Sequence, residues 1–347
     1  MVRYPRFLQP GDRIGVTSPS SGVPAHLRGR LDVAVAWLRD HGADVEVGAC
    51  LDGSSHVSAP AEARADELMR MLLDPSIRAV VPPWGGETAI DLVPLLDFDA
   101  LRDAEPTWVV GYSDISTLLV PLTLVSGWAT VHGDNLMETP YEPPAGLLHW
   151  FDLVSGYDEE GGPVSTFRQA PPGIHRANDW DRWEDDPTPT RHTWNGTGGW
   201  RRLDGGTGDV DVSGRLIGGC IETLHHLAGT RFADPASLRG TGGGEPLIVY
   251  VEACEDSAFS ICRSLHGMRL SGFFDGAAAV LVGRTTAPGS PTLTQDEAVL
   301  DALRPLGVPV IADVDCGHVP PHLILVNGAR ARLVHDPHTS FLEQELA

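Results

Sequence analysis

Short apolar runs alternate with stretches of helix-spaced apolar residues over the first 145 positions of the chain. The apolar runs predict strands at 13–17, 44–47, 79–82, 107–110 and 129–132. The helix-spaced stretches predict helices at 30–40, 60–73 and 115–125. Because strands that alternate with helices build mostly parallel sheets, we expect residues 1–145 to form a doubly wound N-terminal α/β domain.

The pattern breaks between residues 146 and 210, which are rich in glycine, proline, aspartate and tryptophan. Four tryptophans fall in one short span: Trp180, Trp183, Trp194 and Trp200. A disordered linker is poor in aromatic residues. We therefore expect an ordered crossing segment in which these side chains pack against other parts of the protein.

The alternation of strands and helices resumes from residue 211. Apolar runs predict strands at 246–252, 277–282 and 309–312 and a β-rich run at 323–326. Helix-spaced residues predict helices at 259–270 and 295–303. We expect residues 211–347 to form a second domain, and we find no internal repeat.

Composition narrows the class of protein. The chain has 347 residues, of which 42% are hydrophobic, which is enough for a large core in two domains. No stretch approaches the roughly 20 apolar residues of a membrane span, and the first residues carry no signal core with a cleavage site, so we expect a cytoplasmic protein without a membrane partner. The 47 acidic and 25 basic residues give a net charge of -22, which repels nucleic acid. Five scattered cysteines without C-x-x-C spacing indicate reduced thiols.

Ser113 is the candidate nucleophile. It lies in Gly111-Tyr112-Ser113-Asp114, between the strand predicted at 107–110 and the helix predicted at 115–125. A serine at a strand-to-helix turn is exposed, and amides at the helix N-terminus can stabilise developing negative charge. The alternative is that Ser113 or Asp114 only caps the helix, because both residue types are favoured caps.

A serine nucleophile needs a base and a group that orients this base. His318 lies in a loop after a predicted strand, where active-site side chains of α/β sheets gather, and it is the candidate base. Glu252 ends the strand predicted at 246–252 and could fix the histidine tautomer. A surface-loop histidine and a solvated acid are the alternatives, and Glu255 or Asp256 could take the place of Glu252.

Gly85 and Gly86 follow the strand predicted at 79–82. Two glycines there let backbone amides approach a ligand closely, as an oxyanion hole requires. A simple tight turn is the alternative explanation.

Cofactor and metal signals are weak. The glycine-rich stretch 214–219 could imitate a nucleotide loop, but it has neither G-x-G-x-x-G spacing nor a Walker lysine. His132, His225 and His226 lack the i, i+4 arrangement with an acid that a zinc helix shows. We therefore expect no cofactor and no metal.

Taken in order, these segments resemble the serine peptidases of the LD-carboxypeptidase family, the S66 family, which also contains the microcin C self-immunity hydrolases. The matching pieces are Pro10-Gly11-Asp12, Ser18-Pro19-Ser20, Gly85-Gly86, Gly111-Tyr112-Ser113-Asp114, His132-Gly133, Gly218-Gly219, Leu224, Gly229-Thr230, Glu252, Gly317-His318 and Pro321. Each piece is short, but together they span nearly the whole chain in the family's order.

The resemblance implies a catalytic triad of Ser113, Glu252 and His318, with the serine on the N-terminal domain and its partners on the C-terminal one. It implies an oxyanion hole made by the backbone amides of Gly86 and Asp114. The implied fold is an N-terminal flavodoxin-like or Rossmann-like parallel sheet with a C-terminal swivelling, β-rich α/β domain. The implied assembly is a homodimer.

Departures from the murein-cleaving members favour the microcin-immunity branch. Those members often have an arginine before Gly-Gly and an aromatic residue before Gly-His, where Trp84 and Cys316 stand here. They also have a shorter segment between the domains.

An indole face stacks on a nucleobase for about 1 to 3 kcal/mol, which suits an aminoacyl-nucleotide substrate. The substrate-binding candidates are Trp180, Trp183, Trp194 and Trp200. The alternatives are a murein tetrapeptide carboxypeptidase and, in a different class, a non-catalytic protein that binds a small ligand.

Overall fold

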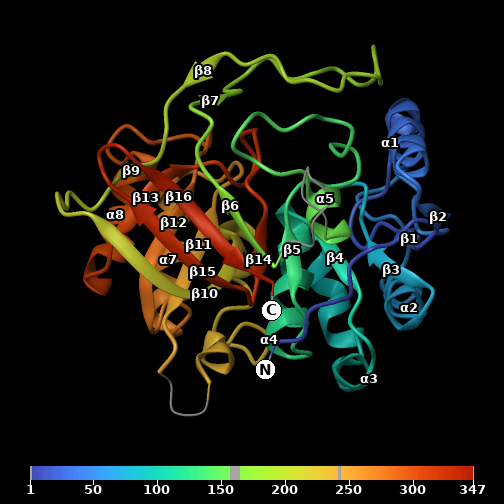
Figure 1. Cartoon of the computed structure of the whole chain (residues 1–347), viewed down its shortest axis with the longest axis horizontal. Coiled ribbons are helices and arrows are strands. Elements are labelled where there is room, and N and C mark those ends of the chain that lie inside the picture. Colours follow the sequence, from blue (N-terminus) through green and yellow to red (C-terminus); the bar gives the residue numbers. More distant parts are fainter. Residues whose placement is uncertain (1, 157–164, 241–243, 347) are drawn as a thin grey trace.

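The computed structural model of the chain describes residues 2–156, 165–240 and 244–346. Within these residues the strands form a six-stranded sheet, an eight-stranded sheet and a two-stranded ribbon. Figure 1 shows the two large sheets side by side, with most of the N-terminal one in blue to green and most of the C-terminal one in orange and red. The chain is therefore an α/β protein with two domains, as its pattern predicts.

The first sheet has the flavodoxin-like strand order that the resemblance implies. Its parallel strands are β1 (Arg13–Val16), β2 (Asp44–Val47), β3 (Ile77–Val80), β4 (Trp108–Gly111) and β5 (Thr130–His132). They are arranged in the order β2-β1-β3-β4-β5, a topology in which ligands bind beyond the carboxyl ends of the strands. Beyond β5, β14 (Leu325–Asn327) adds an antiparallel strand from the C-terminal part of the chain. The predicted parallel strands agree with the observed ones to within two residues.

Helices accompany this sheet at the positions that the apolar spacing predicts. They are α1 (Arg28–Asp40), α2 (Ala61–Leu73), α3 (Phe98–Asp103), α4 (Ser116–Leu124) and α5 (Trp150–Ser155), with the 3-10 turns η1 (Ala25–Leu27), η2 (Ala89–Leu95) and η3 (Ser113–Ile115). The helices predicted at 30–40, 60–73 and 115–125 correspond to α1, α2 and α4. Residues 116–123 of α4 are all buried, because this helix packs against β5 and against β10 of the second domain.

The second sheet is built around four parallel strands: β10 (Val210–Cys220), β11 (Leu247–Glu252), β12 (Ala277–Gly283) and β13 (Val310–Val314). Antiparallel strands extend it on both sides: β15 (Arg330–His335), β16 (Ser340–Glu345) and β6 (Thr166–Gln169) beyond β10, and β9 (Arg201–Arg202) beyond β13. The helical elements are α6 (Ile221–Leu224), α7 (Ala258–Leu270), α8 (Gln295–Leu303), η4 (Pro235–Arg239) and η5 (Arg304–Leu306). Residues 214–219, considered above as a nucleotide loop, lie inside β10.

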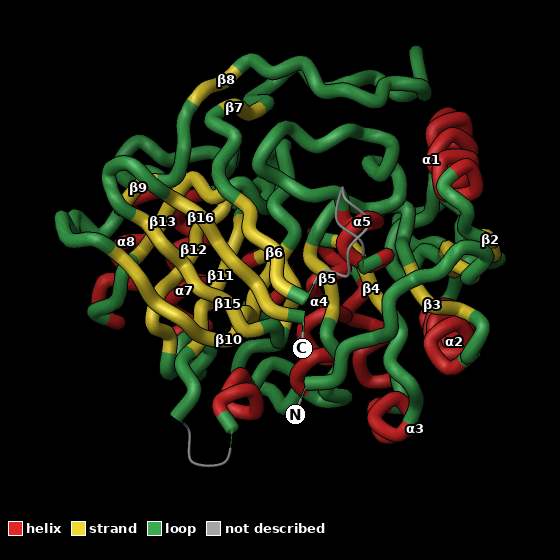
Figure 2. The backbone as a smooth tube through the Cα atoms, viewed as in Figure 1, coloured by secondary structure: helices red, strands yellow, loops and turns green. Residues whose placement is uncertain are grey.

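The described part of the crossing segment is tied to the second sheet at both ends. Its strands β6 and β9 form the two edges of that sheet, and β7 (Ile174–His175) pairs with β8 (Gly196–Thr197) in the ribbon. Figure 2 shows that most of the segment is loop. In Figure 1 it runs from the ribbon across the top of the molecule toward α1.

A single cluster of buried apolar side chains continues from the first domain into the second. It includes Leu118 of α4, Ile217 of β10 and Leu224 of α6. Close packing of this kind holds the carboxyl ends of β4 and β11 in a defined relation. Among the residues described, no helix is both long enough and apolar enough to cross a membrane.

Candidate active site

Ser113 is held in a strained backbone conformation at the carboxyl end of β4. Its φ angle is +63°, a left-handed value that a non-glycine residue adopts at a cost of about 1 to 2 kcal/mol. The turn η3 begins at Ser113, and α4 follows directly. A strained, over-determined position of this kind is typical of a functional residue on a rigid element.

His318 links Ser113 to Glu252 by two hydrogen bonds. The Nε2 atom of His318 is 2.9 Å from the Oγ of Ser113. Its Nδ1 atom is 2.8 Å from the Oε2 of Glu252, the last residue of β11. Gly317, with φ +92°, allows the close approach of this loop, because a Cβ atom there would lie 2.4 Å from Glu252 Oε2. The three residues thus form one hydrogen-bonded line across the two domains.

Burial and charge interactions shift the pKa values of His318 and Glu252 in opposite directions. Burial by itself would lower the pKa of His318, but the charge of Glu252 and the interactions with the side chains of Cys254 and Glu252 outweigh burial, and the pKa is raised well above 6.5. Burial by itself would raise the pKa of Glu252, yet the interaction with His318 lowers it below its ordinary value. The site therefore favours a protonated His318 beside an ionised Glu252.

The neighbouring acids do not take this place. Glu252 accepts the Nδ1 hydrogen bond of His318, whereas the main-chain amides of Glu255 and Asp256 donate to Glu222. Of the three acids, Glu252 is the one that belongs to a strand, as the last residue of β11, and its side chain is fully buried.

Gly85 and Gly86 lie directly against the serine turn. A Cβ atom at Gly85 would lie 2.9 Å from the backbone nitrogen of Asp114 and 3.0 Å from the Oγ of Ser113. Gly86 has φ +143°, and a Cβ atom there would lie 2.4 Å from the Oγ of Ser20. The Asp114 carboxylate accepts from Ser20 Oγ at 2.6 Å and so joins the loops after β1 and β4. Gly85 is thus packed closely against Ser113 and the backbone nitrogen of Asp114.

Aromatic and titratable residues around His318 were not selected by the sequence analysis. The ring of Tyr112 meets the His318 ring edge-on, with centroids 5.0 Å apart, and its hydroxyl donates to Glu138 at 2.6 Å. The Tyr112 ring also contacts the ring of His322, which pairs with Asp134. No local motif marks these residues, since their meeting depends on the fold.

His132 lies behind the triad. Its Nε2 is 4.0 Å from the Oε1 of Glu252, and neither atom has a hydrogen-bond partner within the part of the chain that the structure describes. Burial lowers the pKa of His132 to about 4. It is therefore a neutral neighbour of Glu252 at physiological pH.

A cavity of about 280 Å³ opens beside His318. Its lining includes Tyr112, Glu138, Tyr141, Arg176, Trp180, Asp181, Trp183, His192 and Pro320. Trp180 is 48% exposed, and Trp183 is partly buried. Aromatic faces and carboxylates therefore stand within one hollow next to the candidate base.

The other two tryptophans lie elsewhere. Trp194 is in contact with His192 rather than with the cavity itself. Trp200 is only 6% exposed, and its Nε1 donates to the Asp315 carboxylate at 2.9 Å. Trp200 is therefore placed as a packing residue of the C-terminal sheet.

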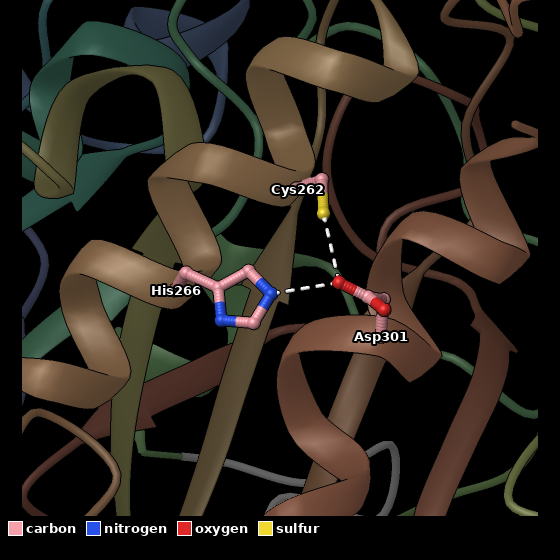
Figure 3. A group of neighbouring side chains, drawn as sticks. All are labelled: Cys262, His266 and Asp301. Atoms are coloured by element: carbon pink, nitrogen blue, oxygen red, sulfur yellow. Dashed lines mark hydrogen bonds and ion pairs between the residues drawn. The ribbon is translucent and has the colours of Figure 1, made fainter.

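A group of three potential metal ligands lies on the two helices α7 and α8. Cys262 and His266 face Asp301, with their ligand atoms within 4.8 Å of one another (Figure 3). Nε2 of His266 is 2.8 Å from Asp301, whereas Nδ1 is 3.3 Å from a guanidinium nitrogen of Arg269. Because Arg269 can only donate, Nδ1 accepts and Nε2 carries the proton toward Asp301. We interpret this group as a polar contact between the two helices.

A serine hydroxyl, an imidazole and a buried carboxylate in one hydrogen-bonded line are the arrangement that serine hydrolases use. Family models of the LD-carboxypeptidase N-terminal and C-terminal domains match residues 14–133 and 213–333. The chain therefore belongs to the LD-carboxypeptidase family of peptidases, family S66.

The chain is similar to relatives that are named for two different activities. The microcin C7 self-immunity protein MccF of Escherichia coli is 27% identical over 97% of this chain and 95% of that protein. The murein tetrapeptide carboxypeptidase of Pseudomonas aeruginosa is 31% identical over 44% of this chain and 52% of that protein. The solved structure of MccF in complex with aspartyl sulfamoyl adenosine has a TM-score of 0.79 at 21% identity, covering 99% of this chain and 98% of that one.

Proposed function

We propose that this protein is a serine amidohydrolase that cleaves the amide of microcin C-like aminoacyl nucleotides and thereby detoxifies them. The observation that carries this proposal is the hydrogen-bonded line Ser113–His318–Glu252, which opens on an aromatic-walled cavity through His318. The relative named for microcin immunity and the neighbour solved with aspartyl sulfamoyl adenosine support this substrate class.

In the proposed mechanism, Ser113 Oγ attacks the amide carbonyl while neutral His318 accepts its proton on Nε2. The oxyanion receives hydrogen bonds from the backbone amides of Gly86 and Asp114, and such donors are worth about 10²- to 10³-fold in kcat. His318 then protonates the leaving nitrogen as the C–N bond breaks, which leaves an acyl ester on Ser113. Water attacks this ester, His318 takes the proton of the water, and the free acid leaves as Ser113 Oγ is reprotonated.

The cavity supplies contacts for a nucleobase. Trp180 and Trp183 line it, and stacking on an aromatic side chain is worth about 1 to 3 kcal/mol per base. The carboxylates of Glu138 and Asp181 can accept from the amino group or ring N–H of a base. We propose Trp180 and Trp183 as the substrate contacts among the four tryptophans.

A murein tetrapeptide is the second candidate substrate, and the similarity to the Pseudomonas aeruginosa enzyme favours it. It would use the same triad.

We also propose the homodimer implied by the family resemblance, which sedimentation equilibrium would test directly.

Purified enzyme should be given aspartyl sulfamoyl adenosine and a murein tetrapeptide in parallel, with products identified by mass spectrometry. We expect release of aspartate and sulfamoyl adenosine at the higher kcat/KM, and no release by a Ser113→Ala variant. Efficient cleavage of the tetrapeptide alone would support the second candidate. Fluorophosphonate labelling of Ser113 without cleavage of either compound would show that the substrate class is wrong.

A further inference from the structure

Arg30 is a fully buried guanidinium group whose hydrogen bonds go to carbonyl oxygens. It lies in α1 and is 0% exposed. Its Nε donates to Met137 O at 2.7 Å, and its Nη1 donates to Pro187 O at 2.9 Å and Pro189 O at 2.8 Å. Among the described residues no carboxylate is within ion-pair distance of it, and Glu138, Asp181 and Asp186 act on it only through longer-range charge interactions. A buried charge is costly to maintain, so this placement requires a reason.

The guanidinium group of Arg30 also packs against two aromatic side chains of the cavity wall. Its guanidinium carbon lies 4.7 Å from the ring centre of Tyr141 and 5.0 Å from that of Trp183. Both aromatic residues line the cavity beside His318. Carbonyls 187 and 189 belong to the crossing segment, which Figure 1 shows extending to α1.

A chain of hydrogen bonds runs from Trp183 to the loop that carries His318. Trp183 Nε1 donates to the Tyr141 hydroxyl at 2.9 Å, and this hydroxyl donates to Asp181 at 2.7 Å. Asp181 in turn accepts from Arg176 at 2.5 Å. The backbone nitrogen of Arg176 donates to Pro320 O at 2.9 Å, two residues after His318. Through its contacts with the Tyr141 and Trp183 rings, Arg30 therefore adjoins a hydrogen-bonded chain of cavity-lining residues that reaches the loop of His318.

We propose that Arg30 is a positioning residue that sets substrate affinity by holding Trp183 and residues 187–189 in their binding arrangement before the substrate arrives. The proposal rests on the proposed function, because it takes the cavity to be the substrate site. Lysine does not replace this group, since a single ammonium cannot present the planar fork that bonds several carbonyls and stacks on two rings. Preorganisation lowers the cost of binding, so its loss should raise KM rather than lower kcat.

The test compares Arg30→Lys with Arg3→Lys. Arg3 also bonds only carbonyls, those of Leu101, Arg102 and Ala104, but these lie in or directly after α3 and not in the cavity wall. We expect Arg30→Lys to raise KM for aspartyl sulfamoyl adenosine about tenfold with kcat within about twofold, which corresponds to about 1.4 kcal/mol of lost binding. Arg3→Lys should leave KM unchanged. If Arg30→Lys does not fold, Arg30→Gln, which removes the buried charge, takes its place.

Hydrogen exchange provides a readout that does not depend on the substrate. Amide exchange over residues 183–190 should accelerate in Arg30→Lys and stay at the wild-type rate in Arg3→Lys. Unchanged exchange over this segment, or faster exchange with an unchanged KM, would overturn the role of Arg30. Failure of wild-type enzyme to cleave the conjugate would instead overturn the proposed function, and the exchange data alone would then decide whether Arg30 holds the segment.

Discussion

The Nδ1 atom of His318 lies 2.8 Å from the Oε2 of Glu252, whose side chain is wholly excluded from solvent. The two residues come from different elements of the C-terminal domain and are 66 positions apart. Their pairing raises the pKa of His318, which must lose its proton before it can act as a base on Ser113. The pH dependence of the enzyme follows from this contact.

We expect kcat/KM to rise with pH through a limb that lies above the ordinary histidine pKa of about 6.5. Below this limb His318 is protonated and cannot accept the Ser113 proton. Glu252→Gln removes the charge that raises the pKa, so the limb should move to lower pH while kcat falls on the order of 10⁴-fold. Glu255→Gln should change neither quantity. A pH–rate series on the three proteins measures both effects, and a limb unmoved in Glu252→Gln would assign the titration to another group.

Ser113→Ala should lower kcat on the order of 10⁴-fold or more while substrate still binds. Ser113→Gly should be equally inactive but about 1 kcal/mol more stable than Ser113→Ala, because glycine adopts φ +63° without the steric cost. Urea unfolding gives the stability difference. Normal turnover by either variant would exclude Ser113 as the nucleophile.

Gly86→Ala should lower kcat about 10²- to 10³-fold, because the new methyl group would displace the loop whose amide is proposed to hold the oxyanion. A Cβ atom at Gly86 would lie 2.4 Å from Ser20 Oγ. Gly11→Ala is the matched control: Gly11 also has a positive φ, +87°, but a Cβ atom there meets nothing within 4 Å. Steady-state kinetics with equal losses in both variants would show that backbone strain, and not the oxyanion hole, is responsible.

Trp180→Leu should raise KM for the nucleoside conjugate several-fold with little change in stability, since Trp180 is 48% exposed and lines the cavity. Trp200→Leu should leave KM unchanged and lower the free energy of unfolding by on the order of 2 kcal/mol, because it partly empties a packed site beside the Asp315 carboxylate. Calorimetry and kinetics on the two variants separate the roles. If Trp200→Leu raised KM and Trp180→Leu instead lowered stability, the cavity would not be the nucleobase site.

Asp315→Asn should stabilise the protein at neutral pH. Burial raises the pKa of Asp315 from 3.8 to about 6, so the folded state holds this proton more tightly than the unfolded state does. Stability contributed by the protonated carboxyl is therefore lost as pH rises from about 4 to about 6. Asparagine keeps an acceptor for Trp200 without the charge and should add on the order of 1 to 3 kcal/mol at pH 7.5, but nothing at pH 4. Equal effects at both pH values in urea unfolding would contradict this explanation.

The sequence by itself determined the parallel strands of the N-terminal domain, three of the four parallel strands of the C-terminal sheet and the long helices, because their apolar spacing is a local property of each segment. It also singled out Ser113, Glu252 and His318, since each lies at a strand end or in a loop marked by glycine or proline. It did not reveal β10, whose glycines at 214–219 resemble a loop, nor β15 and β16, although the alternation in β15 is a strand pattern that could have been used.

Only the tertiary structure decided which of these residues meet. Ser113 and His318 are 205 positions apart, and no spacing rule joins residues at such a separation. The choice of Glu252 over its acidic neighbours depends on which side chain the sheet buries toward His318. The cavity wall depends on Arg30 reaching carbonyls more than 150 positions away, a contact that the crossing segment makes only when it folds back over the N-terminal domain. Local patterns specify elements because their physical causes are local, whereas the site forms where elements that are distant in sequence pack together.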